Sequence, residues 1–240
     1  MRYFRKVKSK AFIRSFIFSI VKNRKKSDDF NDLRIIKYNK QINITGDALI
    51  MQTKTKTREF QSKTIEIDDS GTGDLVGDAF IGFHVLETGE MIFRGVPVGL
   101  YNEPNHKERK AMKHILEMVK DGLNALDFNK ETDQVQLCRG NCFDLVREWF
   151  EEEGIRHEPA IVEGELQDAV EGRYVSHLKK LGITSPKLTK EAGAQRYFVL
   201  FNWVAKNLPQ REKFVKTGFP SWGKKWREIA KNRSPRRNHY

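Results

Sequence analysis

Two adjacent carboxylates, Asp68 and Asp69, precede a segment rich in glycine and hydroxyl side chains, SGTGDLVG over residues 70–77. Carboxylate oxygens are hard ligands that suit Mg²⁺ or Mn²⁺. In a regular strand the two acids point to opposite faces, so they can share one site where the chain turns. Gly71 and Gly73 supply such a turn and let the backbone approach a phosphate or ribose closely. The segment therefore predicts a divalent-metal site beside a phosphate-contacting loop.

Two other interpretations apply to the same segment. A dinucleotide-binding glycine loop requires a helix directly after it, whereas residues 79–86 are rich in β-branched and aromatic side chains and predict a strand. A tight hairpin of ordinary turn residues would leave Asp68 and Asp69 solvated at its mouth. Three glycines with two adjacent acids exceed what a hairpin needs, so we favour the metal site.

The elements that position these acids follow from hydrophobic periodicity. Alternating, β-branched and aromatic residues predict strands over residues 64–68, 79–86, 91–98, 135–138 and 159–162. Apolar residues spaced three and four apart, with glycines just past two of the segments, predict helices over residues 107–126, 143–153 and 166–181. The predicted order is β-β-β-α-β-α-β-α.

This order restricts the topology. A three-stranded antiparallel meander followed by two αβ units can place its later strands parallel to the first strand, on that strand's free edge. The result is an α/β domain over residues 60–185 with a mixed five-stranded sheet flanked by helices. This is the ribonuclease H-like order, although a fold by itself does not assign a function.

Residues 68–77 resemble the first-strand motif of the type 2 ribonucleases H (HII/HIII), especially the HIII branch. In that branch an Asp-Glu pair is followed by Ser-Gly-Thr-Gly-Asp and, after two residues, by Gly; here the second acid is Asp69, and Asp78 replaces a usual Pro. The resemblance implies that Gly71, Thr72 and Gly73 contact the nucleic-acid backbone beside the scissile phosphate. The Asp-Ser-Lys element of the family has no match after the third strand, which indicates a divergent relative.

Hydrolysis of a phosphodiester by two metal ions needs further carboxylates from other elements. Glu165 and Asp168 lie three residues apart and share a face of the predicted helix, and Asp168 is our first choice for the acid that completes a ribonuclease H-like site. Its alternative is a solvated acidic first turn. The resembled family places an Asp at the end of the fourth strand, where this sequence has LCRGNC and the nearest acid is Asp144. We expect Asp68, Asp69 and Asp168 to hold the metals, with Asp144 or Glu165 assisting.

The two cysteines, Cys138 and Cys142, are separated by three residues. No second cysteine or histidine pair completes a four-ligand soft-metal site, so we interpret them as buried structural thiols. Two cysteines in 240 residues cannot form a disulfide framework, and a reducing cytoplasm is therefore the expected compartment.

Charge is distributed unevenly along the chain. The net charge is +9 over residues 1–50, −8 over residues 51–185 and +11 over residues 186–240. An acidic centre between basic ends fits a metal site whose surroundings hold a polyanion. Two solvated basic tails are the alternative.

The basic ends form two predicted extensions. Residues 1–59 contain an apolar run of eleven residues that is interrupted by Arg14, whereas a membrane-spanning helix needs about 20 apolar residues. A basic amphipathic helix at a membrane or nucleic acid stays open there, and the segment is expected to lie outside the fold. In residues 186–240, Trp222 and Trp226 alternate with Lys224 and Lys225. Such residues suit phosphates and unstacked bases, or else the rings anchor a helical extension.

The sequence thus predicts a nuclease that depends on Mg²⁺ or Mn²⁺ and hydrolyses RNA, RNA–DNA hybrid or structured DNA. A non-catalytic nucleic-acid-binding protein on the same scaffold is the main alternative, and a partner-binding protein with a purely structural hairpin is another.

Overall fold

The computed structural model describes residues 62–188 and 193–233, which belong to one compact unit, residues 59–240. The basic N-terminal extension predicted over residues 1–59, with its apolar run, lies outside the described residues. In the part of the chain that is described, no helix is both long and apolar enough to cross a membrane.

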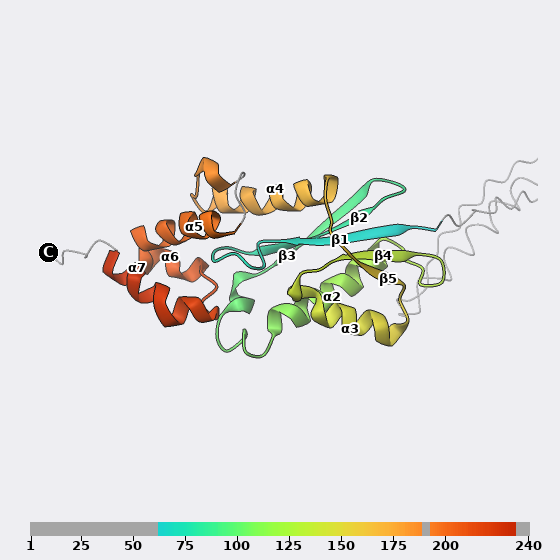
Figure 1. Cartoon of the computed structure of the whole chain (residues 1–240), viewed down its shortest axis with the longest axis horizontal. Helices are drawn as coiled ribbons and strands as arrows, with labels where there is room; N and C mark the ends of the chain where they lie inside the picture. The colour runs from blue at the N-terminus through green and yellow to red at the C-terminus, as the bar shows by residue number, and fades with distance from the viewer. Residues whose placement is uncertain (1–61, 189–192, 234–240) are drawn as a thin grey trace, which may run out of the picture. The chain divides into compact units, whose positions relative to one another are not determined.

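A five-stranded sheet forms the centre of the unit (Figure 1). Its strands are β1 (Thr64–Ser70), β2 (Ala79–Val85), β3 (Glu90–Val96), β4 (Gln134–Cys138) and β5 (His157–Ala160). They lie side by side in the order β3-β2-β1-β4-β5. The first three strands pair antiparallel, and β4 and β5 run parallel to β1. This arrangement confirms the predicted mixed sheet of the ribonuclease H-like fold.

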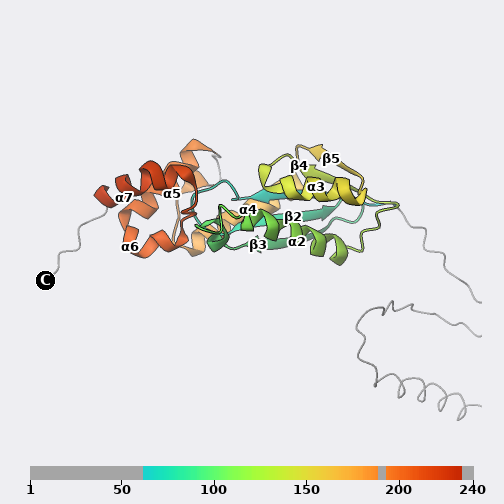
Figure 2. The same cartoon turned by 90° about the horizontal axis from the view of Figure 1, so that it is seen from below.

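Helices cover both faces of the sheet (Figures 1 and 2). Helices α2 (Lys110–Ala125) and α3 (Asp144–Glu153) lie on one face, and α4 (Glu165–Lys180) lies on the other. The chain continues into α5 (Ala194–Lys206), α6 (Leu208–Arg211) and α7 (Arg227–Arg233). Short 3₁₀ turns and a π-helical turn, Trp222–Trp226, connect these elements.

Alternation along β1 explains how the sheet is anchored. Ile65 and Ile67 are fully buried on the face covered by α2, where Ile115 and Val119 meet them. Side chains at positions two apart in a strand share a face, so Asp69 belongs to the same face as the two isoleucines and Asp68 to the opposite one. The core therefore fixes which way each acid points.

A second hydrophobic cluster joins the C-terminal helices to the rest of the fold. It combines Val76 of the glycine loop and Tyr174 of α4 with Phe201 and Val204 of α5 and with Trp222. Residues 193–233, expected as an extension beyond residue 185, are therefore packed into the same structural unit.

The last strand differs in position from its prediction over residues 159–162. The strand β5 spans His157–Ala160 because its pairing with β4 begins at Val135 and His157. Ile161, which was included for its apolar character, is 70% exposed beyond the strand. Pro159 is tolerated because β5 is an edge strand, which needs hydrogen bonds on one side.

Candidate metal centre

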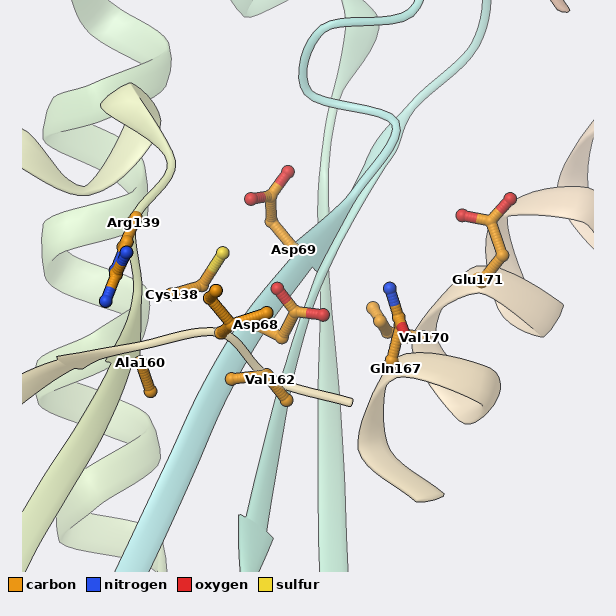
Figure 3. A pocket seen from close by; sticks show the side chains of 10 residues that line it. Asp68, Asp69, Cys138, Arg139, Ala160, Val162, Gln167, Val170 and Glu171 are labelled. Atoms are coloured by element: carbon orange, nitrogen blue, oxygen red, sulfur yellow. The ribbon is translucent and has the colours of Figure 1, made fainter. Parts of the chain in front are cut away.

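Asp68, Asp69 and Cys138 meet where the parallel strands β1 and β4 end (Figure 3). Ile67 pairs with Leu137, so the next residue on each strand, Asp68 and Cys138, lies at the same edge of the sheet. One carboxylate oxygen from each acid and the Cys138 Sγ all lie within 4.8 Å of one another. These are the residues in the described part of the chain that could hold a metal ion as a group of three.

The two acids reach one site without the turn that we expected between them. The strand β1 stays regular through Ser70, with Asp68 opposite Gly82 and Asp69 opposite Ile81 on β2. Asp68 lines a cavity of about 260 Å³ together with residues of α4, while Asp69 contacts Cys142 on the opposite face. Both acids sit at the end of the strand, so their carboxylates can converge around its edge.

Hydrogen bonds orient the Asp69 carboxylate. The Thr72 hydroxyl donates to Oδ2, and the Cys142 thiol donates to Oδ1 over 3.3 Å. Thr72, which we expected to contact nucleic acid, therefore also positions a candidate metal ligand.

Burial shifts the pKa values of the side chains at this site. Asp68 is 6% exposed, and this burial raises the pKa of its carboxyl, with the Asp69 and Glu171 carboxylates adding to the rise and a hydrogen bond with Cys138 opposing it. Burial, with the neighbouring Asp68, likewise raises the pKa of Cys138 to about 12. No cation of the described residues forms an ion pair with Asp68. A desolvated, unpaired carboxylate beside a second one fits a bound divalent cation.

A third carboxylate, Glu171, faces the cavity from α4 (Figure 3). Its Oε2 accepts a hydrogen bond of 2.5 Å from the Ser70 hydroxyl, and its Oε1 pairs with the Arg196 guanidinium. Glu171 was not among the acids expected from the sequence. Its spacing was the available signal, since it lies about one helical turn beyond Asp168.

The structure does not bring the other expected acids to this cavity. Asp168 is exposed and lines a separate hollow between α4 and the strands β2 and β3. The Glu165 side chain is 81% exposed, with Oε2 3.9 Å from His84 Nε2. Asp144 pairs with Arg147 over 2.6 Å at the start of α3. Asp168 lies on a different side of α4 from Gln167 and Glu171, which line the cavity, and Glu171 takes the place that we assigned to Asp168.

The two predicted loop glycines have different surroundings. Gly71 is buried with φ +82°, and a Cβ there would lie 2.6 Å from the Tyr174 ring. Gly73 is exposed and has no atom within 4 Å of the corresponding position. Gly71 is thus required by the turn and by close packing, whereas Gly73 is the glycine that is open to a ligand.

A buried cation supports the glycine loop from the C-terminal segment. The Lys216 ammonium, fully buried, donates to the carbonyl oxygen of Gly71 and lies 4.5 Å from the centre of the Tyr101 ring. Val215 next to it forms a β-bridge with Val76. Burial lowers the pKa of Lys216 to about 8, with nearby Asp74 opposing this shift. The charge pattern does not reveal that Lys216, among the many C-terminal lysines, is internal.

The aromatic residues expected to bind nucleic acid are mostly internal as well. Trp222 is 1% exposed and belongs to the second hydrophobic cluster, so it is not available for stacking on a base. Trp226 packs edge-on against Tyr197 and Phe201. Lys224 and Lys225 are exposed. The rings are therefore anchors of the C-terminal helices, the alternative interpretation of this segment.

The known proteins that this chain resembles do so at low similarity. No protein-family model matches the sequence, and no curated protein matches it. A crystal structure of Bst-RNase HIII in complex with Mn²⁺ matches with a TM-score of 0.47 and 14% identity, over 78% of this chain and 77% of that chain. A mutant of Bst-RNase HIII matches with the same TM-score and identity, over 79% and 77%.

The order and directions of the strands define the class of this protein. It has the ribonuclease H-like fold, and its candidate site lies where the central strand β1 ends next to β4. The ribonuclease H-like fold predicted from the sequence is thereby confirmed.

Proposed function

We propose that this protein is a divalent-metal-dependent nuclease that hydrolyses phosphodiester bonds in RNA, RNA–DNA hybrid or structured DNA. The observation that carries the proposal is the convergence of Asp68, Asp69 and Cys138 within 4.8 Å, with Glu171 facing the same cavity. Side chains from β1, β4 and α4 line one cavity at the end of a central strand. A solvated hairpin would not bring together side chains from three elements.

Each residue has a role in this mechanism. Asp68 and Asp69 would hold the cation, and Thr72 fixes the Asp69 carboxylate through its hydroxyl. The bound divalent ion, expected from the sequence to be Mg²⁺ or Mn²⁺, would supply Lewis-acid activation of the phosphodiester. Glu171, held by Ser70 and Arg196, presents a fixed carboxylate to the cavity and orients the reacting groups.

Basic side chains near the cavity suit a nucleic-acid backbone. Arg139 lines the cavity itself. In the neighbouring hollow, Lys180 lies on the same wall as Arg173, whose guanidinium stands 3.9 Å from the centre of the Phe93 ring. Exposed Lys224 and Lys225 carry further positive charge on the C-terminal segment. Cations combined with aromatic rings bind phosphates and bases without strict sequence preference.

A second candidate function is nucleic-acid binding without cleavage. It is favoured by the ion pair between Glu171 and Arg196 and by a thiol where the resembled family has an acid at the end of the fourth strand. This candidate predicts salt-sensitive binding with no product. Both cysteines are free thiols, which fits the cytoplasmic location proposed for either function.

The test is incubation of the full chain with labelled RNA, RNA–DNA hybrid and branched DNA in the presence of Mn²⁺ or Mg²⁺. We expect cleavage of at least one substrate that is abolished by Asp69→Asn and by chelation of the metal. Binding of all substrates without cleavage favours the second candidate. Cleavage that Asp69→Asn leaves unchanged contradicts the proposed site.

A further inference from the structure

We propose that Cys138 is a metal ligand and that the site prefers a thiophilic divalent ion, of the class of Zn²⁺, Co²⁺ and Cd²⁺, over Mg²⁺. The inference rests on the proposed metal centre and specifies which ion that centre takes. It replaces our interpretation of Cys138 as a buried structural thiol.

The position of Cys138 carries the first part of the argument. It is the last residue of β4, next to β1 in the sheet, and its Sγ lies within 4.8 Å of one oxygen from each of Asp68 and Asp69. Its side chain is half-buried: it packs against the edge of the hydrophobic core and also lines the cavity (Figure 3). Packing at the core's edge does not by itself require a sulfur atom within reach of two carboxylates.

A second, independent observation is the state of Asp68. Its carboxylate is more than nine-tenths buried, faces the same cavity, and pairs with no cation among the described residues. Its neighbours Asp69 and Glu171 add further negative charge, and of these two Glu171 forms an ion pair, with Arg196. A bound dication would neutralise the charge that burial leaves uncompensated on Asp68.

The donor set then decides which dication fits. Mg²⁺ requires a near-octahedral shell of oxygen ligands and does not favour sulfur. Thiolates select softer ions, and Zn²⁺ accepts carboxylate and thiolate ligands together. Two carboxylates and one thiolate would supply three protein ligands and leave a fourth position for water or a phosphate oxygen, the same number of protein ligands as in catalytic zinc sites.

Binding of the ion would release one proton from the Cys138 thiol. Without an ion the Cys138 thiol is protonated, because burial and the adjacent carboxylates disfavour the thiolate. On binding, the S–H bond breaks, its proton passes to solvent, and the sulfur electron pair forms the bond to the ion. No oxidation or reduction is involved.

Cys142 supplies a matched control. It lies four residues further on, and its thiol donates to Asp69 Oδ1 over 3.3 Å. Its sulfur is not part of the group of potential ligands formed by Asp68, Asp69 and Cys138. Cys142→Ser removes a thiol of similar environment and keeps a donor to Asp69.

The experiment is a titration of the full chain with Co²⁺, and separately Cd²⁺, followed by absorbance and by calorimetry. Bonds from thiolate sulfur to these ions give charge-transfer bands in the ultraviolet. We expect one ion per chain, with a band in the wild type and in Cys142→Ser and none in Cys138→Ser. We also expect Cys138→Asp to lose the band and to bind Mg²⁺ at least tenfold more tightly than the wild type does.

Two results overturn the inference. A band that survives in Cys138→Ser places the sulfur ligand elsewhere, and Co²⁺ binding without any band shows that no sulfur takes part. Either result leaves the nuclease proposal standing, because cleavage is measured separately with Mn²⁺ or Mg²⁺. Absence of any divalent-ion binding by calorimetry contradicts both proposals. Thermal melting of each variant verifies that a lost band does not reflect unfolding.

Discussion

Glu171 and Asp168 lie one helical turn apart on α4, yet they line different hollows. Glu171 faces the cavity of Asp68 and Asp69, whereas Asp168 lines the hollow against β2 and β3. The difference arises because Gln167 and Glu171 belong to the side of α4 that faces the cavity, whereas Asp168 belongs to the side that faces β2 and β3. The carboxylate that completes the proposed site is thus set by which side of the helix faces the end of β1.

This relationship gives a matched pair of variants. We expect Glu171→Gln to lower cleavage by roughly 10- to 100-fold, because it removes a charged group that orients the reaction. Asp168→Asn should leave cleavage within about twofold, as expected for an exposed side chain outside the cavity. Initial rates on the best substrate with Mn²⁺ measure both. Loss of activity in Asp168→Asn with retention in Glu171→Gln would reverse the assignment.

The Thr72 hydroxyl should affect metal affinity through Asp69. It donates to Asp69 Oδ2, so Thr72→Val removes one of the two hydrogen bonds that orient the carboxylate and should weaken metal binding by about tenfold. Thr72→Ser keeps the donor and should bind as the wild type does. Calorimetric titration with Mn²⁺ and Co²⁺ gives both affinities. Equal affinities in the valine and serine variants would show that this hydrogen bond does not orient the ligand.

The two loop glycines should respond differently to alanine. Gly71→Ala places a side chain at φ +82° and against the buried Tyr174 ring, and we expect a loss of about 2–4 kcal/mol in the free energy of unfolding. Gly73→Ala meets open space, and its cost should stay within about 0.5 kcal/mol. Urea unfolding measures both values. A similar cost at the two positions would contradict the close contact between Gly71 and Tyr174.

Stability at alkaline pH should report the burial of Lys216. Its pKa is lowered to about 8 in the folded state from 10.5, with Asp74, Asp69 and Asp78 opposing the shift. Between these values the unfolded chain holds more protons than the folded chain, so the free energy of unfolding rises with pH, by up to roughly 3 kcal/mol from this residue. Below about pH 8 both states are protonated and the contribution is constant.

Lys216→Met is the control for this prediction. The variant lacks the titrating group, so its free energy of unfolding should not show that rise between about pH 8 and pH 10.5. Urea unfolding of both proteins across this window provides the comparison. Parallel pH profiles would mean that the Lys216 ammonium is not desolvated in the folded state.

Local sequence patterns were sufficient for the elements and their order. Alternation in residues 64–68 predicted β1, and the spacing of apolar residues predicted α2 to within a few residues of its Lys110–Ala125 bounds. Connectivity rules then gave the strand order, because few topologies accept a meander followed by two αβ units. Asp68 and Asp69 were found because adjacent acids before a glycine-rich turn are unusual, which is a purely local signal.

Tertiary structure alone decided which distant side chains join those two acids. Cys138 and Glu171 reach the cavity because of strand register and the orientation of α4, and neither quantity is encoded in the spacing of nearby residues. The same holds for Lys216 and Trp222, which the sequence places in a basic aromatic segment. Lys216 is buried where it donates to Gly71, 145 residues earlier in the chain, and Trp222 is buried in the hydrophobic cluster that contains Val76. The residue types in a sequence determine which chemical groups are available. Only three-dimensional packing determines which of these groups share a site.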